Sequence, residues 1–334
     1  MALSLLEIQQ FLATQGSEQT ALFTQANEIR AQNVGDAVHL RGLLEISSYC
    51  AQNCFYCGLR REHIQLARYR IPPEEIIRLA KEAIKQGFKT IVLQSGEDAW
   101  FSAEKVAHII SEIKKSKVAV TLSLGERPRE DFQCWKEAGA DRYLLRLETS
   151  SPDLYAQLHP GQSWANRVRC LEDLRELGYE VGSGFIIGLP GQSLELLAQD
   201  LKWLVDFEVD MAGLGPFIAH PQTPLGSHPS GGLDLALKAI ATTRLLLPDI
   251  NLPATTALDA LSPDGRWQAL QAGANVLMPN LTPLAYQQRY NIYPDHHEAC
   301  SNLSFKAEHA FKERLAALGR YISTDLGGHK KASL

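Results

Sequence analysis

Three of the chain's six cysteines lie within eight positions, at Cys50, Cys54 and Cys57. Thiolate sulfur binds zinc and iron–sulfur clusters, and buried unreactive cysteines seldom gather so closely. A structural zinc site needs a fourth ligand, for which His63 is the nearest candidate in sequence, and the remaining cysteines are too isolated to complete a four-cysteine cluster. A third possibility is a cubane cluster held by three cysteines, whose fourth iron stays open for a substrate.

The elements around these cysteines alternate between apolar, β-rich runs and helix-period segments. Helical segments such as 73–87 and 103–116 begin near a cap or a proline, as helices do. Eight strands that each feed a helix predict an α/β fold, a parallel (β/α)8 TIM-type barrel, with an open doubly wound sheet as the alternative. The eight strand-like runs are 39–47, 90–96, 118–125, 142–148, 180–188, 210–217, 252–257 and 275–280.

The barrel is predicted to span residues 39–295 as one domain. Residues 1–38 read as a helical N-terminal extension, and residues 296–334 as a helical C-terminal cap. The tail segment within that cap is most simply an amphipathic helix that covers the barrel.

Polar residues gather where the predicted strands end. Examples are the segment 95–98, Glu126, Arg146, Glu148 and His220. In a (β/α)8 barrel the carboxyl ends of the strands carry the active site, whereas loops that merely begin there would also be polar. The pattern favours an enzyme whose cysteine loop lies at this face, directly after the first strand.

Charge and composition exclude several classes of function. The net charge is −5 with interspersed signs, which gives no footprint for nucleic acid or an anionic membrane. No apolar run is long enough to span a bilayer, and the first residues lack a basic segment. Six unevenly spaced cysteines do not form a disulfide framework, so we expect a reducing, cytoplasmic setting.

The C-x3-C-x2-C motif after the first strand of a barrel resembles that of the radical S-adenosylmethionine (SAM) enzymes. The resemblance implies one 4Fe-4S cluster bound by Cys50, Cys54 and Cys57, with SAM on the open iron. Reductive cleavage of SAM would then release a 5'-deoxyadenosyl radical. An electron donor, flavodoxin or ferredoxin, is implied as a partner.

The family's SAM contacts can be carried over to matching positions. The segment 95–97 resembles a turn whose backbone meets the methionyl amino group, and a glycine allows that close approach. Glu148 matches an acid on the ribose hydroxyls, and Arg167 an arginine on the methionyl carboxylate, a task that suits its planar fork. The resemblance implies a SAM site formed by Tyr56, Ser95, Gly96, Glu97, Ser123, Glu148, Arg167 and Leu189.

A narrower resemblance joins the chain to the HydE family of FeFe-hydrogenase maturases. It rests on stretches such as YCGLRRE, TIVLQSGED, GPFIAHPQTPL and GANVLMPNLTP, which follow one another in order between residues 28 and 294. The implied substrate is a small iron-bearing precursor, with other hydrogenase maturases as partners. Two arginines and several hydroxyls in one dry cavity would suit a small anion. The implied cavity residues are Arg41, Gln94, Arg142, Thr255, Thr256, Tyr286 and Tyr290.

One position departs from that family's pattern. Leu147 stands where the family often has histidine, so a different substrate becomes possible. Methylornithine synthase, which acts on a small amino acid, is the rival within the superfamily. A non-catalytic iron–sulfur or zinc-binding protein is the rival from another class.

Overall fold

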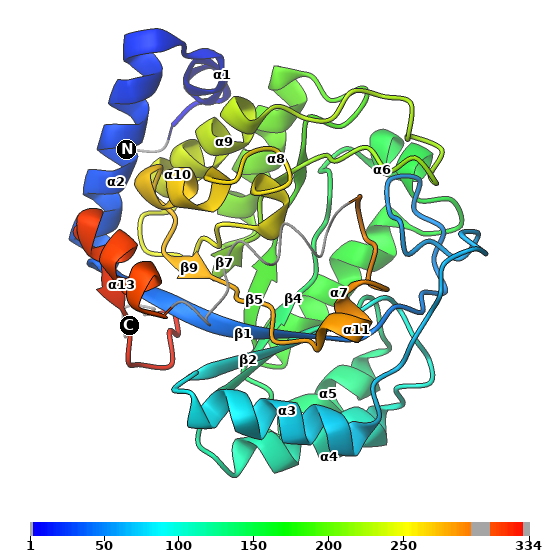
Figure 1. Ribbon diagram of the computed structural model, residues 1–334. Coiled ribbons are helices and arrows are strands. Elements are labelled where there is room, and N and C mark those ends of the chain that lie inside the picture. Colours follow the sequence, from blue (N-terminus) through cyan, green and yellow to red (C-terminus); the bar gives the residue numbers. More distant parts are fainter. Residues whose placement is uncertain (1–2, 295–307, 330–334) are drawn as a thin grey trace.

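The computed structural model describes residues 3–294 and 308–329 (Figure 1). Residues 296–307 of the predicted cap, with Cys300, lie outside the described residues. The division into extension, barrel and cap stays a prediction. Within the described residues no helix is long and apolar enough to cross a membrane.

The centre of the molecule is a parallel sheet in the order β10-β1-β2-β3-β4-β5-β7, with β9 also paired to β1. Bridges from Met211 to Asn251 and from Pro253 to Val276 continue the parallel pairing from β7 through residues 251–253 to β9, which closes the ring. The (β/α) barrel prediction is therefore confirmed. The strands are β1 (Ala37–Ser47), β2 (Thr90–Ser95), β3 (Ala119–Ser123), β4 (Arg142–Leu144), β5 (Glu180–Ser183), β7 (Met211–Ala212), β9 (Val276–Leu277) and β10 (Tyr321–Ile322).

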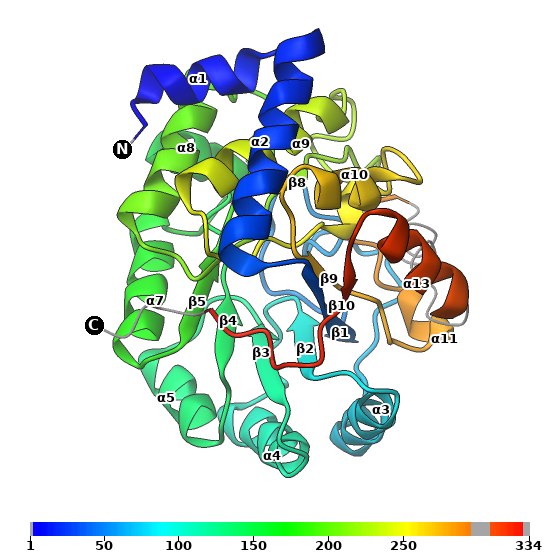
Figure 2. The same ribbon diagram turned by 90° about the vertical axis from the view of Figure 1, so that its left-hand side faces the viewer.

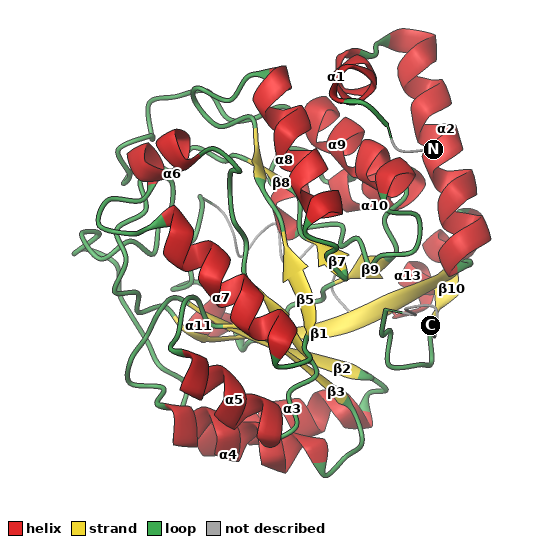
Figure 3. Cartoon of the chain, turned by 180° about the vertical axis from the view of Figure 1, so that it is seen from behind, coloured by secondary structure: helices red, strands yellow, loops and turns green. Residues whose placement is uncertain are grey.

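Helices cover the outside of this ring (Figure 3). In α3 the residues Ile76, Ile77, Ala80 and Ala83 are buried at helical spacing, and Pro73 stands in the first turn, where no intrahelical N–H is needed. The helices are α1 (Leu5–Ala13), α2 (Gly16–Val34), α3 (Pro73–Lys85), α4 (Ala103–Lys114), α5 (Arg129–Glu137), α6 (Pro152–Leu158), α7 (Trp164–Glu176), α8 (Leu194–Asp206), α9 (Leu233–Leu246), α10 (Gly265–Gln271), α11 (Leu284–Gln287) and α13 (Glu308–Ala317).

Two predicted strands are interrupted by glycines that face each other. The run 180–188 divides into β5 and β6 (Ile186–Ile187), and the run 210–217 into β7 and β8 (Gly215–Pro216). A Cβ on Gly184 would lie 2.0 Å from the carbonyl oxygen of Gly213, so only glycine lets the two chains approach here. β6 and β8 form a separate pair beyond this point.

The predicted strand at 252–257 is the least regular of the eight. It contributes one isolated bridge, from Pro253 to Val276, instead of a named strand, and residues Thr256–Leu258 form a 3-10 turn, η1. Just before this turn, Thr255 donates its hydroxyl hydrogen to the carbonyl of Leu214 (3.1 Å).

The opposite, amino-terminal end of the barrel is crossed by residues 321–329, which we call the C-terminal strap (Figure 2). Strand β10 extends the edge of β1, and the carbonyl oxygens of Leu326 and Gly327 then face the barrel. Leu326 accepts hydrogen bonds from Arg142 (2.9 Å) and from Thr90 (3.0 Å), and Gly327 accepts from Arg41 (3.1 Å). Because these carbonyls satisfy buried guanidinium groups, the strap forms the floor of the barrel.

Candidate active site

A cavity of about 270 Å³ opens at the carboxyl ends of the strands and contains the cysteine loop. It brings together most residues that the sequence predicts for the cluster, for SAM and for the substrate. Those that line it are Cys50, Cys54, Tyr56, Cys57, Gln94, Ser95, Gly96, Glu97, Ser123, Glu148, Arg167, Thr255, Thr256 and Tyr290.

The cysteine loop is held against the strand ends by backbone contacts. The amide of Ala51 donates to the carbonyl of Glu97 (2.9 Å), and the amide of Gly58 donates to the carbonyl of Ile292 (2.9 Å). A Cβ on Gly96 would lie 2.4 Å from the carbonyl oxygen of Tyr49. The glycine after β2 is therefore required for the loop to pack, independently of any ligand.

The three sulfur atoms sit in surroundings that disfavour free thiolates. Burial, opposed by a hydrogen bond from Gln162, raises the pKa of Cys54 to about 12. Burial also raises the pKa values of Cys50 and Cys57, and for Cys57 the neighbouring thiols add to the rise. Ionising all three buried thiols together is costly. Cationic iron that replaces the three protons would stabilise the resulting thiolates. The donor set therefore fits a 4Fe-4S cluster.

A mononuclear metal site is not formed by the same residues. Among residues 3–294 and 308–329, no group of three or more His, Cys, Asp or Glu side chains converges on one ion. His63, the fourth zinc ligand that the sequence suggested, bonds through Nδ1 to the carbonyl of Gly58 (2.7 Å).

Arg167 is the buried cation of the cavity. It projects from α7 and pairs with Glu126 (2.6 Å), while Tyr155 lies 3.2 Å from its Nε. Burial alone would lower the pKa of Arg167, but Tyr155 and Glu126 more than offset this and raise it. The guanidinium is therefore permanently charged and fixed in direction, as the binding of a carboxylate requires.

Tyr56, the aromatic before the last cysteine, is fixed by a histidine. Its hydroxyl lies 2.8 Å from Nε2 of His159, whose Nδ1 lies 2.9 Å from the carbonyl of Tyr155. A carbonyl only accepts, so Nδ1 carries the hydrogen, and Nε2 accepts from Tyr56. Burial and Arg167 lower the pKa of His159 to about 3, which keeps the ring neutral.

Glu148 lies in the left-handed region of backbone conformation, with φ of 71°, which is unusual for glutamate. Backbone pairing with Phe185 holds it there, and its carboxylate pairs with Arg146 (2.9 Å) in the cavity. Burial raises the pKa of Glu148. Backbone strain maintained beside a cavity is typical of functional sites.

Arg146 and Gln162 also line the cavity, although the sequence assigned neither to a cluster, SAM or substrate contact. Arg146 was already among the polar residues at the predicted strand ends, and it lies two residues before Glu148 in the predicted strand 142–148. Gln162 gives no such signal, because it lies in the turn between α6 and α7.

Four predicted residues lie outside the described lining of the cavity. Leu189 is buried in a small apolar cluster against which Tyr56 packs, and Tyr286 contacts the ring of Tyr69 at 4.9 Å between centroids. Arg41 and Arg142 lie on the barrel floor, where the C-terminal strap binds them. The physical reason is their position: Arg142 is the first residue of β4, at the end opposite the cysteines.

Leu147, the departure from the family pattern, is fully buried in the main hydrophobic core. It is absent from the described lining of the cavity. In this chain, position 147 therefore contributes to core packing and not to the described lining of the cavity.

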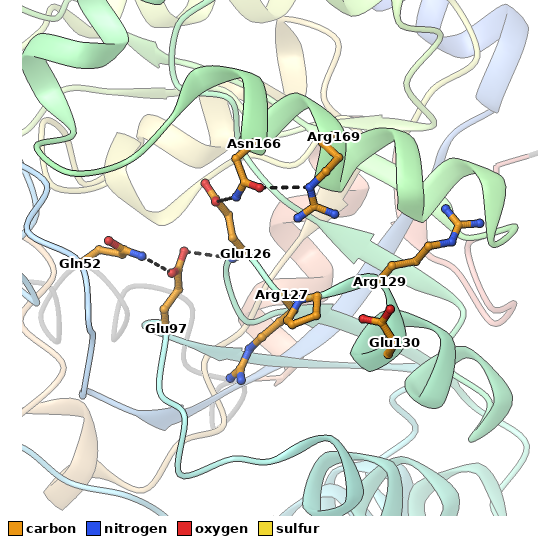
Figure 4. Close-up of a pocket in the computed structure, with 9 residues that line it drawn as sticks. Gln52, Glu97, Glu126, Arg127, Arg129, Glu130, Asn166 and Arg169 are labelled. Carbon is orange, nitrogen blue, oxygen red and sulfur yellow. Dashed lines mark hydrogen bonds between the residues drawn. The ribbon is translucent and has the colours of Figure 1, made fainter.

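A polar surface groove of about 570 Å³ adjoins the cavity and shares Gln52 and Glu97 with it (Figure 4). Glu97 accepts hydrogen bonds from the side chain of Gln52 (2.5 Å) and from the backbone amide of Glu126 (2.9 Å). The side chain of Asn166 bridges Glu126 and Arg169. This network links the cysteine loop to α7.

Comparison with known proteins agrees with this geometry. Residues 44–204 match the model of the radical SAM superfamily. The [FeFe] hydrogenase maturase subunit HydE of Thermotoga maritima is 50% identical over 317 residues, which cover 93% of this chain and 89% of that protein. This chain belongs to the HydE family of radical SAM enzymes.

Other relatives of this HydE-family chain are more distant. A 3-methylornithine synthase of Methanosarcina acetivorans is 28% identical and covers 77% of this chain and 73% of that protein. The crystal structure of methylornithine synthase has a TM-score of 0.82 at 24% identity, covering 97% of this chain and 95% of that one, which shows the shared fold.

Proposed function

We propose that this HydE-family enzyme takes part in assembling the di-iron site of an FeFe-hydrogenase and acts on a small iron-bearing precursor in the barrel cavity. The observation that carries the proposal is the 50% identity to a hydrogenase maturase across nearly the whole chain. The rival methylornithine synthase reaches 28%. Leu147, the departure from the family pattern, is buried in the core and is not part of the described lining of the cavity.

In this proposal, different residues of the cavity bind the cluster and SAM. Cys50, Cys54 and Cys57 hold one 4Fe-4S cluster, whose fourth iron is left for SAM. Arg167 binds the methionyl carboxylate, and Glu148 the ribose hydroxyls. When bound, the cluster and SAM supply the 5'-deoxyadenosyl radical after one electron arrives from a flavodoxin or ferredoxin.

The remaining lining residues suit a small polar substrate below that site. Thr255, Thr256, Gln94 and Tyr290 offer hydroxyl and amide groups, and Tyr290 is fixed by a hydrogen bond from Gln94 (3.3 Å). The charged pair of Arg146 and Glu148 lines the same cavity.

The test is anaerobic reconstitution with iron and sulfide, followed by reduction with dithionite in the presence of SAM. We expect about four irons per chain and formation of 5'-deoxyadenosine. The iron-bearing precursor should stimulate that formation, whereas lysine should not. Stimulation by lysine alone would favour the methylornithine synthase type of reaction.

Cys54→Ser should retain the folded barrel but lose the cluster and SAM cleavage. Cys134→Ser is the matched control, because this half-exposed cysteine lies on α5, outside the described lining of the cavity. A colourless wild-type protein with one zinc per chain would contradict the proposed function.

A further inference from the structure

Gln162 connects the cysteine loop to Arg167. It lies in the turn between α6 and α7, where its backbone amide donates to the carbonyl of His159 (3.1 Å). Its side-chain nitrogen donates to the sulfur of Cys54 at 3.2 Å, and its side-chain oxygen accepts from Arg167 at 3.0 Å. One amide therefore touches both a predicted cluster ligand and a predicted SAM contact.

The orientation of this amide is dictated by its charged neighbour. A guanidinium has only donors, so the oxygen of Gln162 must face Arg167. The NH2 group is then left pointing at the sulfur of Cys54. Arg167 is itself held by Glu126 and Tyr155, so the donor cannot easily turn away.

The sulfurs of Cys50 and Cys57 accept hydrogen bonds from backbone amides. Cys50 lies 3.4 Å from the amide nitrogens of Gln52 and Glu97, and a backbone hydrogen bond from Leu59 reaches Cys57. Among the hydrogen bonds of the described residues, Gln162 thus supplies the side-chain donor to this triad. Backbone donors are invariant to substitution, whereas this donor can be removed by changing one residue.

We propose that Gln162 is a positioning residue that tunes the reduction potential of the cluster through its hydrogen bond to Cys54. The inference rests on the proposed cluster ligation. Reduction adds negative charge that spreads onto the thiolate ligands, so a donor at sulfur stabilises the reduced state more than the oxidised state. Loss of the donor should therefore lower the potential and make the cluster harder to reduce.

The experiment measures the potential of the reconstituted cluster without SAM, by redox titration followed by electron paramagnetic resonance. In Gln162→Leu we expect the equilibrium constant for one-electron reduction to fall about threefold to tenfold. At 59 mV per tenfold change, the reduction potential should then fall by roughly 28 to 59 mV. Gln162→Glu keeps the shape but replaces the donor with a negative charge. The potential of Gln162→Glu should fall further. The potential should therefore decrease from wild type to Gln162→Leu to Gln162→Glu.

Gln133→Leu is the matched control. Gln133 is exposed on α5, its side-chain amide donates to Glu137 (2.9 Å), and it lies outside the described lining of the cavity. This variant should keep the wild-type potential at an equal iron content.

The outcomes separate this inference from the proposed function. A wild-type protein that binds no cluster would overturn both. A wild-type protein that binds a cluster and cleaves SAM, with an unchanged potential in Gln162→Leu or an equal fall in Gln133→Leu, would overturn the role of Gln162 alone. Loss of the cluster in both Gln162 variants, but not in Gln133→Leu, would assign Gln162 to cluster retention and overturn tuning.

Discussion

The substitution Gly96→Ala tests how the cysteine loop is positioned. The added Cβ would lie 2.4 Å from the carbonyl oxygen of Tyr49 and 2.6 Å from Cβ of Cys50, whereas carbon–oxygen contacts are ordinarily about 3.3 Å or longer. The backbone φ of Gly96 is outside the left-handed region, so the cost is steric and not conformational. The two chains must separate by about 1 Å to admit the methyl group.

Overpacking of this kind costs about 1–3 kcal/mol. A separation of about 1 Å would also break the contact between the amide of Glu97 and the sulfur of Cys50, now 3.4 Å. We therefore expect Gly96→Ala to lose about 1–3 kcal/mol of unfolding free energy as apoprotein, measured by urea titration. Its iron content after reconstitution should fall well below that of wild type.

Gly232→Ala provides the control for Gly96→Ala. No atom lies within 4 Å of its added Cβ, and its φ is −78°. Its cost should stay under about 1 kcal/mol, because alanine is only a poorer N-cap than glycine. If Gly96→Ala matched wild type in stability and in iron content, the packing argument for this glycine would be refuted.

Two further predictions concern groups that hold the fold. Asp210 (2.8 Å) and Asp249 (3.4 Å) raise the pKa of His329. The stabilisation that His329 provides is therefore fully present below about pH 6.5, its ordinary pKa. It is lost as the pH rises through the higher pKa of the folded state. The loss of unfolding free energy in His329→Gln should therefore be largest near pH 5.5 and should shrink at alkaline pH in melts across pH. A constant difference would contradict this. Arg244→Met should cost at least about 3 kcal/mol in urea titration, because Arg244 donates to three backbone carbonyls. A cost below about 1 kcal/mol would show that those carbonyls find other partners.

Much of the barrel could be predicted from sequence because its signals are local. The run 39–47 and the helix at 73–87 have clear periodicities, and the structure places β1 and α3 within two residues of them at each end. The cysteine motif needed only its position after the first strand. The glycine pair at 184 and 213 could not be foreseen, because the clash joins residues from different strands.

The predicted site was least accurate at the arginines of the floor. Inward-facing side chains alternate along a strand, but alternation does not say how deep in the barrel each one lies. The guanidinium of Arg41 donates to the carbonyl of Gly327, which is 286 residues away in sequence. No local sequence pattern could therefore show that this guanidinium already has a partner in the fold. The incorrect placement of Arg142 in the cavity could have been avoided. The first residue of a parallel strand lies at the amino-terminal end of the barrel and cannot reach the carboxyl-terminal mouth.

The C-terminal strap also has a consequence for how the chain is made. Strand β1 is synthesised early, but Ala37 pairs with Tyr321, and Asp36 with Arg320, across 284 residues. At about 5–20 residues per second the ribosome needs about 15 to 60 s to supply the missing edge. During that interval β1 presents unpaired backbone groups, and such an edge invites association with other nascent chains. A chaperone that shields β1 would therefore be expected to raise the yield of folded enzyme more than one acting on the outer helices.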